Sequence, residues 1–500
     1  MKTPNKSKNN IPFLLVFIVV FGIALRLAFP VGIVVSGDLV HLKYAIDIAK
    51  GNYNPTAKDP STATRIGFIY PTALFFKILG INEFSAYIFP LIMSIASILL
   101  VYFLGKLFFN EKTALAAAFL MSFFPLSVNY STQAFPDLPQ AFFMALSVLF
   151  FFYGEKSSSK KNQILFHLFT GISAGIAYSM KQSGILIFLF FGIYIMYNLF
   201  YKKQKFKASY FLIFVGALFM IFLYSLHDYL VSGDPLLAYR QLDTDYVAAV
   251  KNVYNYKGYK LFERLFFHIP YMMLTNVNFG FFGVFALMAL SYIIIYKKKN
   301  TVPVALWLIV LFLYLNFGTT SLSQYLPLPG GAPRYMDIIS IPAILVIAFF
   351  LTQEDVLIKK MMLPFTLIFL LFTSIAFIYI NPDRNSIASE KQIGEFLKAQ
   401  KPLKIYADGR TKTVLSFLYE NKFDMEIYWI GKYPYTGSET LIKSSDMKNA
   451  YVIINKSYFN RIPQNYLATF PDIYYNAPKN WKLIKTIKNP YGDVLIYYAS

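Results

Sequence analysis

Cysteine is absent from this 500-residue chain, and histidine and tryptophan are rare, with four and three copies. The absence of cysteine excludes disulfide bonds, thiolate metal sites and cysteine nucleophiles. The four histidines show no spacing typical of a metal site. Residues 383–500 contain no P-loop and no Gly-x-Gly-x-x-Gly pattern, so we expect no nucleotide there.

Acidic residues are scarce: 26 of them face 47 basic residues, which gives a net charge of +21. In a soluble protein this excess would suggest nucleic-acid binding. Here most lysines of residues 1–382 lie in short loops between apolar runs, where basic side chains fix the orientation of a membrane protein. We therefore expect no nucleic-acid partner.

Apolar residues are abundant, at 56% of the chain, with 52 Phe and 39 Tyr. No globular surface covers that much apolar area, so the sequence predicts a multi-pass α-helical membrane protein. The first apolar run is longer than a signal-peptide core and lacks a small-x-small cleavage site, so we expect it to be retained. Eleven membrane spans are predicted, at residues 11–29, 84–104, 113–130, 138–153, 163–180, 184–201, 208–226, 278–296, 303–318, 337–352 and 361–380.

The distribution of lysine predicts the orientation. With the N-terminus in the cytosol, the cytosolic segments hold many lysines against only four acids, as the positive-inside rule requires. The outer segments 30–83 and 227–277 are then the long ones, which indicates that the work is done on the outer face. The cytosolic lysines are Lys2, Lys6, Lys8, Lys106, Lys112, Lys156, Lys160, Lys161, Lys202, Lys203, Lys205, Lys207, Lys297, Lys298, Lys299, Lys359 and Lys360.

Residues 383–500 are polar and follow the membrane domain at 1–382. An odd number of spans sends this tail to the extracytoplasmic side of the cell membrane. Short β-branched and aromatic runs alternate with helical segments, which is typical of a small α/β domain. We expect helices at 385–400 and 411–420, and strands at 403–408, 425–431, 450–456 and 493–500.

Three charged residues recur where predicted spans reach the outer surface: Asp38, Asp137 and Lys181. Charges at membrane depth are costly unless paired or hydrated, so each is a functional hypothesis. The structural alternatives are a helix cap for either aspartate and a snorkelling lysine for Lys181. His41 lies three residues after Asp38, on the same helical face, and is a candidate for substrate contact.

Arginine is used sparingly, with 8 copies against 39 lysines, and none falls in a predicted cytosolic loop. A planar, permanently charged guanidinium suits phosphate, so at least one outer arginine is expected to bind an anion. A lysine-rich genome that places arginine by chance is the alternative. The arginines of the outer half are Arg26, Arg65, Arg240, Arg264 and Arg334.

Several motifs, in this order along the chain, resemble the C superfamily of glycosyltransferases, and most of all its protein-mannosyltransferase and aminoarabinose-transferase-like members. They are Asp38 after the first span, YAIDIAKGNYNP, the long stretch from YPTALFFKILG to NYSTQAFPD, SMKQSGIL, SGDPL and PRYMDIISIPAILVIA. The resemblance covers about three-quarters of the chain. It implies a polyprenyl-phosphate sugar donor in an outer-facing cavity, no nucleotide sugar, and inversion at the anomeric carbon.

The resemblance also implies roles for single residues. Asp38 matches the first-loop acid, the general base or acceptor-orienting carboxylate, although Leu39 stands where many relatives have a second acid. Lys181 and Arg334 match positions that hold the donor phosphate. Asp137 matches the second outer acid, which helps hold a metal in some relatives.

Elementary chemistry agrees with these roles. Glycosyl transfer needs a carboxylate to take the acceptor proton, and cations to stabilise the departing phosphate. Asp38 supplies the first, and Lys181, Arg334 and Arg65 supply the second. A divalent cation between Asp38 and Asp137 would share that task, but two carboxylates make a thin metal site.

We therefore predict an outer-facing membrane glycosyltransferase whose acceptor is a protein, lipid or glycan. One alternative is a transporter or flippase for a lipid or solute, which would place ionisable groups near the middle of its spans. Another is a receptor or scaffold whose tail binds a partner. That alternative leaves the charged outer loops without a role.

Overall fold

The computed structural model describes residues 11–34, 37–243, 256–319, 325–328, 332–353, 357–431, 438–460 and 470–500. Residues 1–10, with three of the expected cytosolic lysines, lie outside the described residues, as do residues 244–255 of the predicted outer segment 227–277. The chain divides into two compact units. The membrane unit comprises Met1–Val31, Val40–Phe75 and Tyr87–Pro382, and the tail unit comprises Gly32–Leu39, Phe76–Ala86 and Asp383–Ser500.

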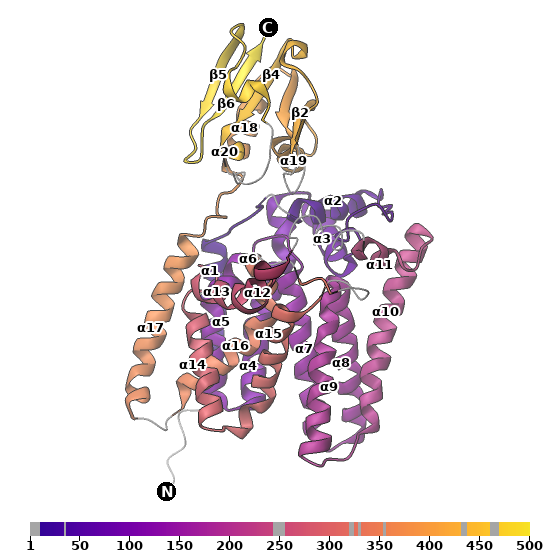
Figure 1. The fold of residues 1–500 in the computed structure, drawn as a ribbon, viewed down its shortest axis with the longest axis vertical. Coiled ribbons are helices and arrows are strands. Elements are labelled where there is room, and N and C mark those ends of the chain that lie inside the picture. Colours follow the sequence, from indigo (N-terminus) through magenta and orange to yellow (C-terminus); the bar gives the residue numbers. More distant parts are fainter. Residues whose placement is uncertain are drawn as a thin grey trace. The chain divides into compact units, whose positions relative to one another are not determined.

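The described residues before Pro382 form mainly helices (Figure 1). They are α1 (Ile11–Ala28), α2 (Gly37–Lys50), α3 (Ile66–Leu79), α4 (Glu83–Phe108), α5 (Glu111–Phe123), α6 (Pro125–Tyr130), α7 (Asp137–Lys156), α8 (Lys160–Met180), α9 (Ile187–Met196), α10 (Phe211–Ser232), α11 (Leu237–Leu242), α12 (Gly258–Glu263), α13 (Ile269–Thr275), α14 (Phe282–Ile295), α15 (Val302–Phe317), α16 (Asp337–Thr352) and α17 (Leu357–Tyr379).

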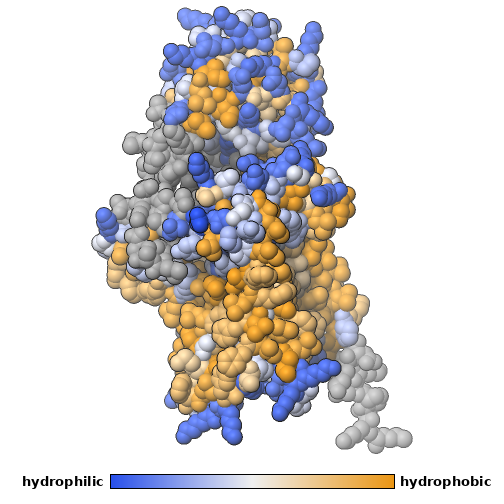
Figure 2. Space-filling model, turned by 90° about the vertical axis from the view of Figure 1, so that its right-hand side faces the viewer, coloured by the Kyte–Doolittle hydropathy of each residue, from blue (hydrophilic) through white to orange (hydrophobic). Residues whose placement is uncertain are grey.

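Each predicted span coincides with a helical segment. Among the described residues, seven such segments are both long and apolar enough to cross a bilayer. Others, such as α5 with 13 residues and α14 with 14, are shorter than a full crossing, so eleven spans remain a prediction. Figure 2 shows the apolar band that these helices present, with hydrophilic side chains beyond it. The chain is a multi-pass membrane protein.

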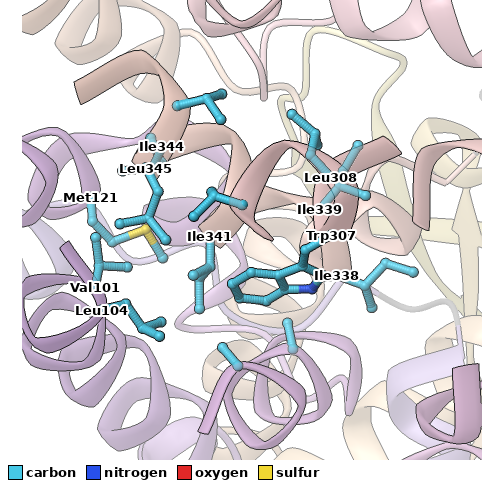
Figure 3. Close-up of a cluster of buried hydrophobic side chains, with 14 of the residues drawn as sticks. Val101, Leu104, Met121, Trp307, Leu308, Ile338, Ile339, Ile341, Ile344 and Leu345 are labelled. Atoms are coloured by element: carbon cyan, nitrogen blue, oxygen red, sulfur yellow. The ribbon is translucent and has the colours of Figure 1, made fainter. Parts of the chain in front are cut away.

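Helix α16 is the centre of the membrane unit. Its span is 83% buried, and it packs against α5, α7, α14 and α15. Ile339, Ile341 and Leu345 of α16 meet Trp307 of α15 and Met121 of α5 in one dry cluster (Figure 3). Because lipid is as apolar as this core, close packing rather than water exclusion holds these helices together. The rigid centre fixes the chain just before α16, where Arg334 lies.

Helices α8 and α10 approach each other unusually closely. A Cβ atom at Gly171 would lie 2.0 Å from the carbonyl oxygen of Ile213, and one at Gly216 would lie 2.5 Å from that of Leu168. Only glycine permits this approach, which is a common packing mode in membranes. It fixes the C-terminal end of α8, where Lys181 follows.

Arg26 has a structural role. Its fully buried guanidinium donates to the hydroxyls of Ser94 and Ser127 at 2.8 and 2.9 Å, and to the carbonyls of Gly22 and Ser122. These bonds join α1, α4 and α5 to the start of α6. A phosphate would need the same N–H donors, which already bond to neighbouring helices. Arg26 therefore serves helix packing and not anion binding.

The tail unit contains a mixed six-stranded sheet of order β3-β2-β1-β4-β6-β5. Strand β1 pairs in parallel with β2 and β4, and β4, β6 and β5 pair antiparallel. The elements are α18 (Ala388–Lys398), β1 (Lys404–Asp408), α19 (Gly409–Leu418), β2 (Met425–Gly431), β3 (Ser438–Thr440), β4 (Ala450–Asn455), α20 (Lys456–Phe459), α21 (Asp472–Tyr475), β5 (Trp481–Ile487) and β6 (Val494–Ala499).

Side chains of β1 alternate between two cores. Ile405 and Ala407 pack on the side of α18 and α19, and Tyr406 packs with Trp429 and Phe459 on the other. The predicted strands and both predicted helices of this unit are confirmed within a few residues. Strands β5 and β3 were not anticipated.

Candidate functional site

Two cationic side chains from separate parts of the membrane unit meet at one carboxylate. Asp137 begins α7, Lys181 follows α8, and Arg334 lies in the 3₁₀ helix before α16. The Nζ atom of Lys181 lies 2.6 Å from Oδ1 of Asp137, and Nε of Arg334 lies 3.5 Å from Oδ2. The two cations therefore face different oxygens of the same carboxylate.

The turn that carries Lys181 is fixed by α7. Lys181 has an extended backbone, with φ −162° and ψ 133°, between α8 and a 3₁₀ helix at Gln182–Leu186. The side-chain amide of Gln140 donates to the Lys181 carbonyl at 3.1 Å and to the Ser183 hydroxyl at 2.8 Å. Gln140 lies one turn after Asp137, so one helix positions both members of the ion pair.

Aromatic rings hold the two cations from the other side. The Lys181 ammonium lies 4.1 Å from the ring centroid of Tyr335, and the Arg334 guanidinium lies 4.1 Å from that of Phe135. Such cation–π contacts are worth about 0.5–2 kcal/mol each, and more where water is excluded. Tyr335 was not singled out from the sequence, although it belongs to the motif PRYMD.

Burial differs across this cluster. Asp137 is 3% exposed, whereas the side chains of Lys181 and Arg334 are 13% and 21% exposed. A buried carboxylate is costly without partners, which explains why two cations converge on it. Asp337, a second buried carboxylate, is an electrostatic neighbour of the same three residues and was also missed, although it too lies in PRYMD.

His41 and Arg65 form a second part of the cluster. A guanidinium nitrogen of Arg65 lies 3.2 Å from Nε2 of His41, which is 1% exposed. Burial, followed by the positive charges of Arg65, Arg334 and Lys181, holds the pKa of His41 well below its usual range. His41 is therefore neutral at pH 7. Arg65 contacts His41, and Arg334 and Lys181 both contact Asp137, so these cations fall into two neighbouring groups within the membrane unit.

Arg65 is positioned by contacts between the segments 30–83 and 227–277, both predicted to face outward, and by α10. The hydroxyl of Thr64 donates to the side chain of Gln241 in α11 at 2.9 Å, and the hydroxyl of Tyr224 donates to the Thr64 carbonyl. Gln241 in turn donates to the Thr56 carbonyl at 2.7 Å. The loop before α3 is therefore held by α10 and α11.

Asp38 lies in the tail unit, in the first turn of α2. Its side chain is fully buried, and its carboxylate accepts from the backbone N–H groups of Val34 at 2.7 Å and Leu39 at 2.9 Å. Both bonds tie the carboxylate to the backbone at the entry into α2.

The tail unit supports the segment that carries Asp38. The hydroxyl of Ser386 donates to the Val34 carbonyl at 3.2 Å, and the Arg410 guanidinium donates to the Ser386 carbonyl at 3.0 Å. Arg410 also pairs with the buried Glu390 at 3.2 Å. Residues far apart in sequence thus form one hydrogen-bonded path to the peptide beside Asp38.

The donor set around Asp137 does not suit a metal. The described residues contain no group of three or more His, Asp or Glu side chains that would hold one. Both oxygens of Asp137 face cations, which a metal ion would have to displace. Of the remaining outer arginines, Arg240 pairs with Asp234, and Arg264 donates to the carbonyls of Leu315 and Leu328.

A family model matches part of this chain in sequence, and solved structures match it in fold. Residues 65–227 match the family model described as dolichyl-phosphate-mannose-protein mannosyltransferase. ArnT from Cupriavidus metallidurans in the apo state has a TM-score of 0.60 at 10% identity, over 99% of this chain and 98% of that chain. The same protein bound to undecaprenyl phosphate gives 0.58 at 11%, over 96% and 97%.

An archaeal oligosaccharyltransferase has the same fold. AglB from Archaeoglobus fulgidus, in complex with an inhibitory peptide and a dolichol-phosphate, gives a TM-score of 0.58 at 12% identity, over 99% of this chain and 75% of that chain. No curated protein sequence matches this chain.

The match over residues 65–227 confirms the resemblance to the protein-mannosyltransferase family for that part of the chain. The structural matches show that the chain shares its fold with ArnT and AglB.

Proposed function

We propose that this chain transfers a sugar from a polyprenyl-phosphate donor to an acceptor on the extracytoplasmic face of the cell membrane, with inversion at the anomeric carbon. The observation that carries the proposal is the convergence of Lys181 and Arg334 on buried Asp137. Three distant parts of the chain build this cluster, which contains more cationic side chains than an ion pair needs.

The proposed task of the cations is to bind the donor phosphate. Lys181 and Arg334 are partly exposed, so a phosphate oxygen can approach both side chains while Asp137 holds their charged groups in place. As the bond between sugar and phosphate breaks, negative charge builds on the bridging oxygen, and charge-assisted hydrogen bonds tighten. Arg65, fixed against His41, adds a third positive charge to the same end of the unit.

A lipid donor suits a chain of this kind. The hydrocarbon tail of such a donor can pack against apolar helices, and only its phosphate and sugar need polar partners. Relatives of the same fold were solved with undecaprenyl phosphate and with a dolichol-phosphate. We extend that donor class to this chain, and leave the sugar and the acceptor open among protein, lipid and glycan.

Asp38 is proposed as the base that takes the proton from the acceptor hydroxyl. The proposal rests on its place after the first span and on the family resemblance. Its carboxylate already has backbone donors on both oxygens, which would hold it in one orientation. Asp137 is proposed to position the cations, and His41 to contact the substrate as a neutral ring.

A divalent cation between Asp38 and Asp137 stays a prediction from the sequence, and the donor set weighs against it. We assign no step of the reaction to a metal. Activity that survives treatment of the purified protein with EDTA would agree with this reading.

The position of the charges favours transfer over transport. Asp137 is the first residue of α7 and Lys181 follows the last residue of α8, so this ion pair lies at the ends of its helices. A transporter would place such a pair near the middle of its spans.

The test is incubation of the purified full-length protein with a panel of polyprenyl-phosphate sugars and candidate acceptors, followed by mass spectrometry of lipid and protein products. Sugar transfer from at least one donor is expected, and Asp38→Asn should abolish it at an unchanged protein level. Asp47→Asn, the same change on the same helix, should leave transfer intact. A wild-type protein that uses no donor refutes the function, and active Asp38→Asn refutes the base.

A further inference from the structure

A cavity of about 700 Å³ lies at the end of α7 opposite Asp137. Lys156 is the last residue of α7 and lines this cavity, whereas Asp137 is the first, about 30 Å away along 20 helical residues. The cavity is therefore separate from the cluster proposed to bind the donor. It lies between the end of α7, the end of the α9 segment, the loop at 202–207 and the start of α15.

The polar lining of this cavity is strongly basic. Lys156, Lys202, Lys205 and Lys207 contribute to it, against the single acid Glu155. Glu155 is already neutralised, because it accepts from Lys207 and from the hydroxyl of Tyr210, both at 2.9 Å. An anion that enters would meet surplus positive charge.

Aromatic and apolar side chains form another part of the lining. Phe108, Phe152, Tyr194 and Pro303 form the wall, and the ammonium of Lys202 lies 6.0 Å from the Tyr194 ring. Phe206 also lines the cavity and is 51% exposed, and the neighbouring Phe200 and Tyr201 are 75% and 74% exposed. In Figure 2, hydrophilic side chains gather below the apolar band at this lower end of the membrane unit.

One buried polar group lacks a partner. Asn198 lines the cavity and is 3% exposed, and its Oδ1 atom accepts no hydrogen bond from the described residues. A buried acceptor without a donor is costly, and a ligand that brings a hydroxyl would satisfy it.

We propose that this cavity binds the headgroup of an anionic glycerophospholipid of the phosphatidylglycerol type. The phosphate meets the lysines, a headgroup hydroxyl donates to Oδ1 of Asn198, and the acyl chains follow the exposed aromatic side chains. Basic pockets between membrane helices are known to suit such headgroups. Orientation by the positive-inside rule accounts for lysines on these loops, but not for their convergence with aromatic rings around one cavity.

The test uses native mass spectrometry of the full-length protein, delipidated in neutral detergent and titrated with phosphatidylglycerol or phosphatidylcholine. Phosphatidylglycerol is expected to bind roughly tenfold more tightly, because its phosphate charge is not balanced by a headgroup cation. Equal binding of the two lipids would overturn the proposal. Full competition by millimolar glycerol phosphate would also overturn it, because the site would then be one for a free anion.

Variants separate the cavity from general surface charge. Lys202→Gln with Lys205→Gln is expected to lower phosphatidylglycerol affinity about tenfold. Lys160→Gln with Lys161→Gln removes the same charge from the exposed start of α8, outside the cavity lining, and is expected to leave affinity unchanged. An equal loss in both pairs would overturn the proposal. Lys205→Glu reverses one exposed charge and provides a second variant if the double substitution does not fold.

Discussion

The hydroxyl of Ser386 lies 3.2 Å from the carbonyl oxygen of Val34, a residue 352 positions earlier in the chain. The N–H of Val34 donates to the carboxylate of Asp38. The start of the tail thus holds the peptide that orients the proposed base. We infer from this contact a positioning role for the tail unit, which the sequence left open.

Breaking that contact should slow transfer without weakening donor binding. Ser386→Ala is expected to lower kcat about three- to tenfold, since one buried hydrogen bond is worth roughly 1 kcal/mol, while KM for the donor stays unchanged. Thr413→Ala, an exposed threonine on α19, is the control. A tail that merely stabilises the fold would instead lower the melting temperature and leave kcat per folded protein unaltered.

Gly184 shapes the turn that carries Lys181. A Cβ atom at this position would lie 2.4 Å from the carbonyl carbon of Ala177, so Gly184→Ala must push the turn away from α8. We expect a loss of about 1–3 kcal/mol in unfolding free energy, together with reduced transfer. Gly192→Ala, on α9 with no atom within 4 Å, should be neutral or stabilising in the same thermal unfolding assay. Equal stability of the two variants would contradict the contact.

Asp408 gives the tail unit a pH-dependent stability. Burial, aided by the charge of Glu390, raises the pKa of Asp408 to about 6. Its Oδ1 caps α19 by accepting from the N–H of Thr411 at 2.9 Å. The native state therefore keeps the proton at pH values where the unfolded chain, with a pKa near 3.8, has lost it.

The direction of the pH dependence follows from the linkage between proton binding and folding. This contribution to the unfolding free energy is complete below pH 4 and decreases as the pH rises to about 6. Above that pH, Asp408 causes no further change. The total change is about 3 kcal/mol for this group. Asp408→Asn keeps the cap and should reduce the change in unfolding free energy between pH 4 and 7. Unfolding is followed by the fluorescence of Trp429 and Trp481. An unchanged pH dependence in the variant would show that Asp408 ionises normally.

The apolar runs predicted the helices because a bilayer crossing needs about 20 apolar residues in sequence. The same signal does not distinguish one long helix from two short ones, such as α5 and α6 within the predicted span 113–130. Strand β5 was missed because WKLIKTI mixes lysine with β-branched residues, and its pairing with β6 decides its conformation. Strand β3 has only three residues, too few to show a period.

The site was predicted only in part. A charge beside an apolar run marked Asp137 and Lys181. No local pattern shows that Lys181 and Arg334, which follow Asp137 by 44 and 197 positions, contact its carboxylate. The sequence also cannot distinguish a phosphate ligand from an arginine that joins helices. Arg26 had the residue type and position expected of a phosphate ligand, but it donates to serine hydroxyls and backbone carbonyls. Only packing reveals such partners.

The absence of cysteine makes the orientation directly testable. Lys58→Cys lies in the segment predicted to face outward, and Lys160→Cys lies at the end predicted to face the cytosol. A membrane-impermeant maleimide should label the first in intact cells and the second only after permeabilisation. The reverse pattern would place the Asp137 cluster on the cytosolic side.

Loss of one cation from the cluster tests the central claim most directly. Because Lys181→Met alone leaves a buried carboxylate, it is compared with Asp137→Asn/Lys181→Met, which removes the pair, and with Lys58→Met, which removes an exposed charge. The measurement is kcat/KM for the polyprenyl-phosphate donor in purified protein of matched thermal stability. The account predicts a fall of about 100-fold or more in both Lys181 variants and none in Lys58→Met. Transfer within twofold of wild type after the loss of Lys181 would contradict it.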